Sequence, residues 1–124
     1  MAVKTKQALG ALASLAQETR LAIFRLLVER GPAGLAAGAI AERLGVPDSS
    51  LSFHLAHLTR AGLLVQRRDG RSLVYSADFD GMNALVAYLT ENCCRGRPED
   101  CGLPACDPVP VAEPKNEPKK RSAR

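Results

Sequence analysis

The sequence predicts a mainly α-helical fold that carries a single β-hairpin. Before residue 60, apolar residues recur at three- and four-residue intervals, which is the spacing of amphipathic helices. Two of these helical segments are separated by a short turn that contains Gly45 and Pro47. Further along, two runs with β-branched and aromatic residues flank Asp69-Gly70, the strongest short-range signal for a hairpin. The expected order is therefore helices, hairpin and a final helix.

The three helices before the turn are bounded by glycine and proline. Gly31-Pro32 stops the second of them, because proline cannot continue a helix. Gly45 ends the third, where glycine readily adopts the left-handed conformation of a helix C-cap. We therefore expect helices at about 4–16, 19–30 and 35–44.

The fourth helix carries a stripe of leucines. Residues 47–50 are expected to form a turn and an N-terminal cap, and the helix then runs to about Ala61. Leu51, Leu55 and Leu58 fall at i, i+4 and i+7, so they line one face. Two helices joined by a short turn with glycine form the helix-turn-helix pattern.

The hairpin that follows is basic. Arg67, Arg68 and Arg71 lie around its tip, and Asp78 can then cap a fifth helix that we expect to extend to about Cys93. A helix-turn-helix followed by a basic hairpin is typical of a winged helix-turn-helix. The predicted fold class is accordingly mainly α with a β-hairpin wing.

The length of the chain allows one small domain with a tail. Hydrophobic residues make up 46% of the 124 residues but aromatic ones only 4%, so the core must be aliphatic. We expect residues 1–106 to form one domain, and residues 107–124, where Pro, Glu and Lys dominate, to be a disordered tail. A core this thin would gain from dimerisation.

Charge and hydropathy limit the classes of partner. Lys and Arg outnumber Asp and Glu by 17 to 13, which fits nucleic acid without proving it. No apolar run approaches the roughly 20 residues of a membrane span, and the start of the chain has no clear cleavage pattern of a signal peptide. We therefore expect no membrane partner and a cytoplasmic protein with reduced cysteines.

Opposite its leucines, the fourth helix has a face that points outward. Hydroxyl groups at the helix start can bond phosphates or base edges, and an exposed Phe53 can pack on a thymine methyl group. The hairpin arginines would follow phosphates or enter a minor groove. The candidate DNA-binding residues are Ser49, Ser50, Ser52, Phe53, His57, Arg60, Arg67, Arg68 and Arg71.

These residues also have structural interpretations. The arginines could form a hairpin edge that charge protects from pairing. Phe53 could be a satellite core contact, and His57 could simply be solvated. His54 lies near the leucine face, so we expect it to be packed and hydrogen-bonded rather than a ligand. Because the arginines follow a helix-turn-helix, double-stranded DNA is the favoured partner.

The chain resembles a known family of regulators. The segment ETRLAIFRLL, the run SSLSFHLAHLTRAGLLVQRRDGR and the C-terminal helix are similar to the ArsR/SmtB family of bacterial repressors, over roughly Gly10 to Cys101. The resemblance implies a homodimeric winged helix built around its first and last helices. It also implies a repressor whose DNA affinity falls when an inducer binds.

All four cysteines fall in one short segment at and after the end of the predicted last helix, at Cys93, Cys94, Cys101 and Cys106. The Cys-x-Cys motif that some family members carry on the third helix is absent, because that helix reads LAAGAIAERLG. A family zinc site on the last helix is absent too, since this helix has no His. Cys93, Cys94 and Cys101 instead resemble the cluster of arsenic-responsive members. The resemblance implies that this chain holds no permanently bound cofactor.

Thiolate chemistry agrees with that resemblance. Trivalent arsenic and antimony, As(III) and Sb(III), are thiophilic and accept three thiolates without imidazole or carboxylate ligands. Adjacent cysteines cannot both point into one site from a regular helix, so the helix must fray near Cys93. Arg95 and Arg97 would favour thiolate, whereas the helix C-terminus opposes it. A zinc or cadmium site that includes Cys106, or a redox switch, remains the alternative.

An enzyme is the alternative from a different class. The sequence shows no Ser-His-Asp set, phosphate loop or paired acidic site. An arsenate reductase would need a catalytic cysteine in a phosphate-binding loop, and Cys93-Cys94-Arg95 does not supply one. We therefore expect no enzymatic activity.

Overall fold

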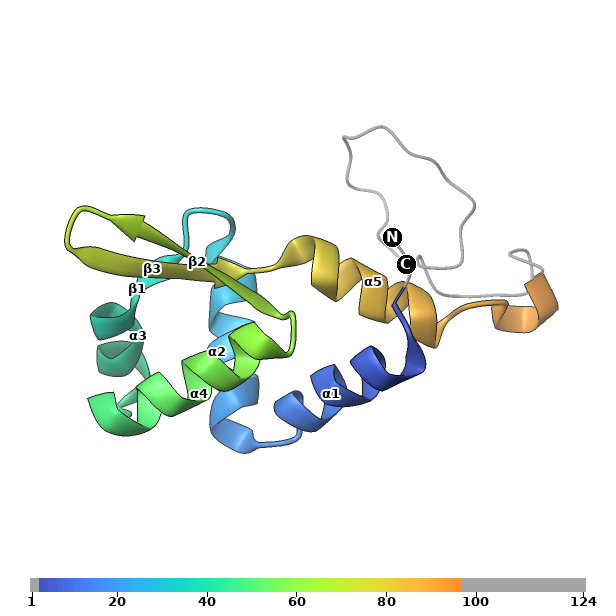
Figure 1. The fold of residues 1–124 in the computed structure, drawn as a ribbon, viewed down its shortest axis with the longest axis horizontal. Helices are drawn as coiled ribbons and strands as arrows, with labels where there is room; N and C mark the ends of the chain where they lie inside the picture. Colours follow the sequence, from blue (N-terminus) through green and yellow to red (C-terminus); the bar gives the residue numbers. More distant parts are fainter. Residues whose placement is uncertain (1–2, 97–124) are drawn as a thin grey trace. The chain divides into compact units, whose positions relative to one another are not determined.

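The computed structural model describes residues 3–96. The chain divides into two compact units, Met1–Leu89 and Thr90–Arg124. Cys101 and the predicted tail at 107–124 lie outside the described residues. The elements in chain order are α1 (Thr5–Leu15), α2 (Glu18–Arg30), β1 (Leu35–Ala36), α3 (Ala37–Leu44), α4 (Asp48–Arg60), β2 (Leu64–Asp69), β3 (Ser72–Ala77), α5 (Phe79–Leu89) and the 3-10 helix η1 (Cys93–Gly96) (Figure 1).

A mainly helical fold with one long hairpin is confirmed, and the first, second and fourth helices fall close to their predicted bounds. The third helix starts two residues later than predicted. Leu35 and Ala36 form the short strand β1, which pairs antiparallel with β3 at Tyr75 and Val74. Backbone pairing with the edge of β3 therefore overrides the helical spacing of these two residues.

The wing is an antiparallel hairpin whose turn lies one residue later than predicted. Its register runs from Leu64 opposite Ala77 to Asp69 opposite Ser72, so Gly70 and Arg71 make the turn. Gly70 has a φ of 65°, which favours glycine at this position. The sheet order is β1-β3-β2, with β3 in the centre.

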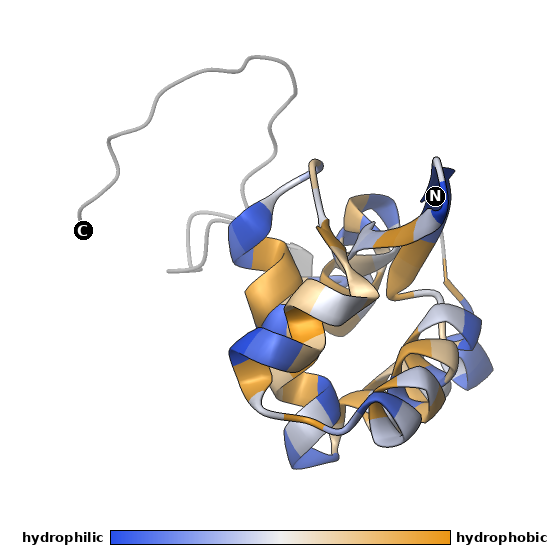
Figure 2. Cartoon of the chain, turned by 90° about the vertical axis from the view of Figure 1, so that its left-hand side faces the viewer, coloured by the Kyte–Doolittle hydropathy of each residue, from blue (hydrophilic) through white to orange (hydrophobic). Residues whose placement is uncertain are grey.

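The leucine stripe of α4 is confirmed as part of the core. Leu51, Leu55 and Leu58 are buried, together with Ile23 of α2 and Ile40 of α3. Figure 2 shows orange and blue stretches mixed along the helices, as expected where one side of each helix packs inward and the other faces water. The core thus fixes which side of α4 remains outside.

The last helix begins as predicted but ends earlier. The backbone N–H of Gly81 donates to the carboxylate of Asp78 at 2.9 Å, which caps the start of α5. The helix was expected to reach Cys93 but ends at Leu89. Asn92 has a φ of 58°, a left-handed conformation that asparagine tolerates better than most residues and that an α-helix cannot contain.

Among the described residues, no helix combines the length and the apolar character that crossing a membrane requires.

Candidate nucleic-acid interface

The turn before α4 sets the direction of this helix. Gly45 has φ 67° and ψ 35°, the predicted left-handed C-cap of α3. Pro47 is the N-cap of α4, so Asp48 to Ser50 lie in its first turn and no side-chain cap forms. The N-cap therefore falls within the predicted residues 47–50, at their first residue Pro47.

The start of α4 is polar and open to solvent. The N–H of Leu51 donates to the carbonyl of Pro47 at 2.9 Å, and the N–H groups of residues 48–50 precede this bond. A helix start of this kind attracts anions, because its unpaired N–H groups carry partial positive charge. Ser49 and Ser50 are exposed beside these groups, where their hydroxyls can reach a phosphate or a base edge.

The structure brings most of the candidate DNA-binding residues of α4 onto one exposed face. This recognition face consists of Ser49, Ser50, Ser52, Phe53, Ala56 and Arg60, all of them exposed, with His57 partly buried at its border.

The three wing arginines differ in what they contact. The guanidinium of Arg67 donates to the carbonyl oxygen of Ala33 at 3.0 Å and to that of Pro32 at 3.5 Å. It thereby ties the wing to the loop between α2 and β1. Arg68 and Arg71 are exposed, and within residues 3–96 no hydrogen bond of their side chains is found. These two side chains are thus the ones presented to a polyanion.

His57 does not simply face water. Its Nδ1 lies 3.0 Å from the hydroxyl of Ser14, a side chain of α1 that is 0% exposed. Sequence reasoning missed Ser14, although it continues the three-residue spacing of Ala8 and Ala11 on the buried face of α1. A serine at such a position is a signal, because a buried hydroxyl needs a hydrogen-bond partner.

His54 is packed and hydrogen-bonded, as expected. The guanidinium of Arg20 lies 3.2 Å from His54 Nδ1, and Arg20 Nε donates to the Ser14 carbonyl at 2.7 Å. Because arginine can only donate, His54 Nδ1 accepts and its ring is neutral in this arrangement. Burial, the charge of Arg20 and that of His57 all lower the pKa of His54, in that order. Arg20 was not predicted from the sequence.

Phe53 is exposed beside the rings of two histidines. Its ring centroid lies 5.5 Å from that of His54 and 6.1 Å from that of His57, and each pair meets edge to face. Its side chain is 59% exposed and does not pack against the core. The alternative of a satellite core contact therefore does not fit the geometry.

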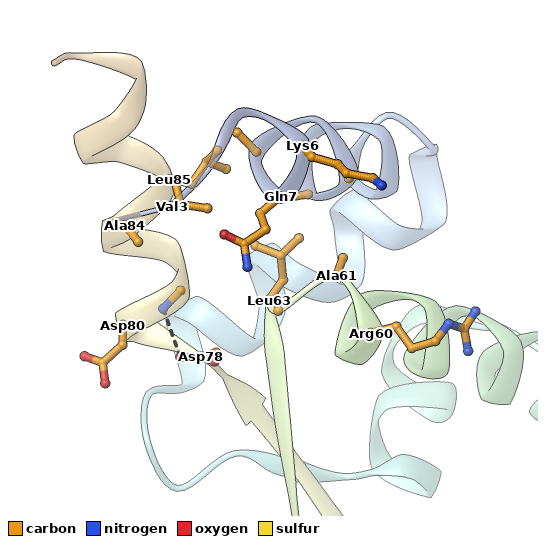
Figure 3. Close-up of a pocket in the computed structure, with 15 residues that line it drawn as sticks. Val3, Lys6, Gln7, Arg60, Ala61, Leu63, Asp78, Asp80, Ala84 and Leu85 are labelled. Atoms are coloured by element: carbon orange, nitrogen blue, oxygen red, sulfur yellow. Dashed lines mark hydrogen bonds between the residues drawn. The ribbon is translucent and has the colours of Figure 1, made fainter. Parts of the chain in front are cut away.

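A cavity of about 690 Å³ lies between α1, the end of α4 and the start of α5. Figure 3 shows Gln7 and Leu63 near its middle, with Asp80 and Arg60 toward opposite sides. The carboxylate of Asp78 is already engaged by the Gly81 N–H. No Ser, Cys or His is among the residues that line the cavity, so its wall offers neither a hydroxyl or thiol nucleophile of Ser or Cys nor a soft metal ligand.

Apolar side chains remain exposed on α1 and α5. Leu9 is 61% exposed on α1 and Leu89 is 58% exposed on α5, with Leu12 and Val86 beside them in sequence. The two helices contact each other, and the hydroxyls of Thr5 and Tyr88 lie 2.6 Å apart. Exposed leucines on adjacent helices are typical of a surface that another protein surface covers.

The predicted thiolate site is only partly described. Cys93 is partly exposed at the start of η1, its N–H donates to the Thr90 carbonyl at 2.9 Å, and Cys94 follows it in the same 3-10 turn. Arg95 is exposed, with a φ of 61°. Among the side chains that the structure describes, no group of three or more His, Cys, Asp or Glu could hold a metal ion. The site at Cys93, Cys94 and Cys101 therefore stays a prediction.

Comparisons of the sequence connect this arrangement to regulators of transcription. A family model described as a helix-turn-helix domain matches residues 15–67. The chain is 32% identical over 89 residues to the HTH-type transcriptional regulator YgaV of Escherichia coli, covering 72% of this chain and 88% of that protein. It is 33% identical over 84 residues to the nodulation protein NolR of Rhizobium meliloti, covering 68% of this chain.

A third relative is an archaeal protein named for arsenic. The putative arsenical resistance operon repressor ArsR of Halobacterium salinarum is 40% identical over 78 residues, which is 63% of this chain. The chain spans 66% of the length of NolR and 60% of the length of this ArsR, less than two thirds of either.

Solved structures share the fold. An ArsR-like transcriptional regulator from Rhodococcus sp. RHA1 is similar with a TM-score of 0.61 and 30% identity, covering 68% of this chain and 76% of that one. The homodimeric winged helix-turn-helix DNA-binding domain Mb0332 from Mycobacterium bovis, a possible ArsR-family regulator, has a TM-score of 0.58 and 30% identity, covering 70% and 81%.

Proposed function

This chain belongs to the ArsR family of winged helix-turn-helix transcriptional regulators, and we propose that it is a repressor released from DNA by arsenite or antimonite. The family consists of DNA-binding regulators rather than enzymes. One observation carries the choice of inducer, namely the grouping of Cys93, Cys94 and Cys101 directly after the last helix of a chain with no earlier cysteine. The arsenic-related name of the archaeal relative supports the same choice.

The recognition face of α4 enters the major groove of operator DNA in this proposal. A homodimer presents two such helices to half-sites about one helical turn apart, roughly 34 Å. Arg68 and Arg71 of each wing reach phosphates or the adjacent minor groove. The exposed leucines of α1 and α5 form the dimer contact, consistent with the homodimeric state named for the mycobacterial relative.

The three cysteines supply the inducer site. Trivalent arsenic or antimony binds three thiolates in a pyramidal arrangement, which needs no imidazole or carboxylate. The end of α5 at Leu89 supports the proposal, because Cys93 and Cys94 then lie outside the regular α-helix, which would direct two successive side chains about 100° apart. Arg95, in the same turn, favours the thiolate form of the cysteines.

Release of DNA requires that the inducer bind more tightly to a conformation with low DNA affinity. Cys93 follows the end of α5 by only four residues, and α5 carries part of the proposed dimer surface. Closing a thiolate site there changes the constraints on this helix and hence on the spacing of the two recognition helices. Such coupling is typically worth about 1–3 kcal/mol per binding event.

A second candidate inducer follows from the fourth cysteine. Cys106 would complete a four-thiolate site for cadmium or zinc, and oxidation of the same thiols would make a redox-responsive regulator of the same fold.

Fluorescence anisotropy with the DNA upstream of the protein's own gene separates these functions. Under reducing conditions, arsenite, antimonite, cadmium and zinc are titrated separately into the complex, and hydrogen peroxide is titrated without reductant. Release by arsenite or antimonite alone is expected. Release by cadmium or zinc instead would establish the divalent-metal function, and release by peroxide alone would establish the redox function. DNA binding that no titrant changes would contradict all of these sensor functions.

A further inference from the structure

We infer that Phe53 determines sequence specificity by contacting the 5-methyl group of a thymine in each half-site. We further infer that Ser14 and Arg20, which do not touch DNA, are positioning residues that hold the Phe53 ring through His54 and His57. This inference rests on the DNA-binding role of α4 and is independent of which inducer the protein senses.

The location of Phe53 points to DNA as the surface that covers it. The other large exposed apolar side chains of the helices lie on α1, α2 and α5, whereas Phe53 is the one on α4. Its neighbours on the recognition face are Ser49, Ser50, Ser52 and Arg60, and the wing adds two exposed arginines. A single aromatic ring within a hydroxyl-rich and basic face fits a polyanion with an isolated apolar group better than it fits a protein surface.

The two neighbouring rings restrict the orientation of Phe53. His54 is the next residue along the chain and His57 lies one helical turn further, so both rings are neighbours of Phe53. Both pairs have an interplanar angle of 65°, with centroids 5.5 Å and 6.1 Å apart. A ring restricted by two aromatic neighbours loses less conformational entropy on binding than a freely rotating one, which favours a defined contact.

Both histidines belong to one hydrogen-bond network that includes Ser14 of α1 and Arg20 of α2. The Ser14 hydroxyl lies 3.0 Å from His57 Nδ1, and its carbonyl accepts from Arg20 Nε at 2.7 Å. The same guanidinium reaches His54 Nδ1 at 3.2 Å. Ser14 is fully buried, so its hydroxyl is held at that end of the network. The orientation of the Phe53 ring on α4 therefore depends on hydrogen bonds that Ser14 of α1 and Arg20 of α2 make with the two histidines.

Thymine is the base whose chemistry matches an apolar ring. Its 5-methyl group is the apolar feature of the major-groove edge, where the other bases present hydrogen-bond donors and acceptors. Deoxyuridine differs from thymidine only by that methyl group. Burial of one methyl group is worth a factor of about four in affinity at 25 °C.

Deoxyuridine scanning tests the inference. Duplexes bound by the wild-type protein are first selected from a random pool, and each thymine is then replaced singly by deoxyuridine. We expect one thymine in each half-site whose replacement lowers affinity about fourfold for the wild type. The same replacement should leave the affinity of Phe53→Ala unchanged, although this variant binds the parent duplex more weakly.

The positioning role has its own readout and a matched control. Ser14→Ala and Arg20→Lys should reduce the fourfold thymine preference while remaining folded dimers by circular dichroism and sedimentation. Arg25→Gln changes an exposed arginine on the same helix as Arg20 and should keep the full preference. A merely structural role would lower affinity for the thymine and uracil duplexes equally.

Three results would overturn the inference. The first is a wild-type protein that tolerates deoxyuridine at every position, and the second is a Phe53→Ala variant with an undiminished thymine preference. In both of these cases DNA binding itself stands. The third is a protein that selects no DNA at all, which would contradict the DNA-binding role together with the inference.

Discussion

At the scale of single residues, the polar side chains around α4 divide into those that face outward and those that join helices. Ser49, Ser50 and Arg60 are exposed, whereas the ring nitrogens of His54 and His57 are engaged by Arg20 and Ser14. Helical spacing predicts the first group, because it depends only on which face the leucines occupy. The second group depends on contacts between distant parts of the chain, which spacing within one helix does not encode.

His54 should make the stability of the fold depend on pH. Its pKa in the folded protein is lowered by burial, by Arg20 and by His57, while the unfolded chain titrates near the ordinary value of about 6.5. Below that value the unfolded state binds more protons, so the free energy of unfolding falls as the pH drops from about 6.5 toward the lowered pKa. Urea denaturation between pH 7.5 and 5 measures this loss.

His54→Gln is the control for this pH effect, because glutamine retains an acceptor for Arg20 but does not titrate in this range. The variant should show a smaller loss of stability over the same interval. An unchanged pH profile in the variant would assign the dependence to other groups.

Gly81 should tolerate no larger residue. A Cβ at this position would collide with the backbone carbonyl oxygen of Gly62, where the start of α5 passes the end of α4. Gly81→Ala should therefore lower the free energy of unfolding by about 1–3 kcal/mol, the usual cost of overpacking. Gly38→Ala is the matched control, since nothing lies within 4 Å of its Cβ and alanine favours the helix. Equal stability of the two variants in urea denaturation would contradict the close approach.

At the scale of elements, the sequence predicts which elements exist better than it predicts where they end. The glycine cap at Gly45 and the Asp78 cap follow from local chemistry and are confirmed. Strand β1 could not be predicted, because two residues carry no periodicity and their pairing partner lies about 40 positions away at Tyr75. The early end of α5 likewise depends on the left-handed Asn92, which helical spacing does not exclude.

The wing should contribute to DNA affinity through two of its three arginines. Replacing Arg68 or Arg71 by Gln removes one phosphate interaction from each protomer, which should weaken binding to all sequences similarly. The slope of log K against log salt concentration should fall by about 1.8 in magnitude, because each of the two phosphates in the dimer complex contributes about 0.9. Anisotropy titrations between 50 and 200 mM salt measure this slope.

Arg67 provides the internal comparison for the wing. The guanidinium of Arg67 is held by the carbonyls of Ala33 and Pro32. Arg67→Gln should therefore lower the free energy of unfolding and leave the salt slope nearly unchanged. A decrease in slope for Arg67→Gln equal to that for Arg68→Gln would show that Arg67 contacts phosphate as well.

At the scale of the whole molecule, we expect the exposed leucines of α1 and α5 to form the contact of the proposed dimer. Leu9→Glu or Leu89→Glu places a charge in the proposed contact and removes two buried leucines per dimer by symmetry. If the free energy of dimer association weakens by about 3 kcal/mol, the dimer dissociation constant rises on the order of a hundredfold. Sedimentation equilibrium measures the change, and tight binding to a two-half-site operator should be lost in parallel.

Leu73→Glu serves as the control for dimerisation, because Leu73 is exposed on the wing and away from α1 and α5. It should sediment as the wild-type dimer. A Leu9→Glu variant that stays dimeric at the same concentration would place the dimer contact elsewhere.

The cysteine site belongs to this largest scale as well. The sequence alone identifies the residue types and their grouping, from the chemistry of thiolates and from the resemblance to a family. How the cysteines come together depends on the path of the chain after Gly96, which lies outside the described residues. The inducer is therefore established best by functional titration of variants.

The most direct test of the sensor function compares release of DNA by arsenite in four single variants, by anisotropy under reducing conditions. Cys93→Ser, Cys94→Ser and Cys101→Ser should bind operator DNA like the wild type but stay bound at arsenite concentrations that release it. Cys106→Ser should release DNA as the wild type does. A Cys93→Ser variant that binds normally and still releases at the wild-type arsenite concentration would contradict the three-cysteine site.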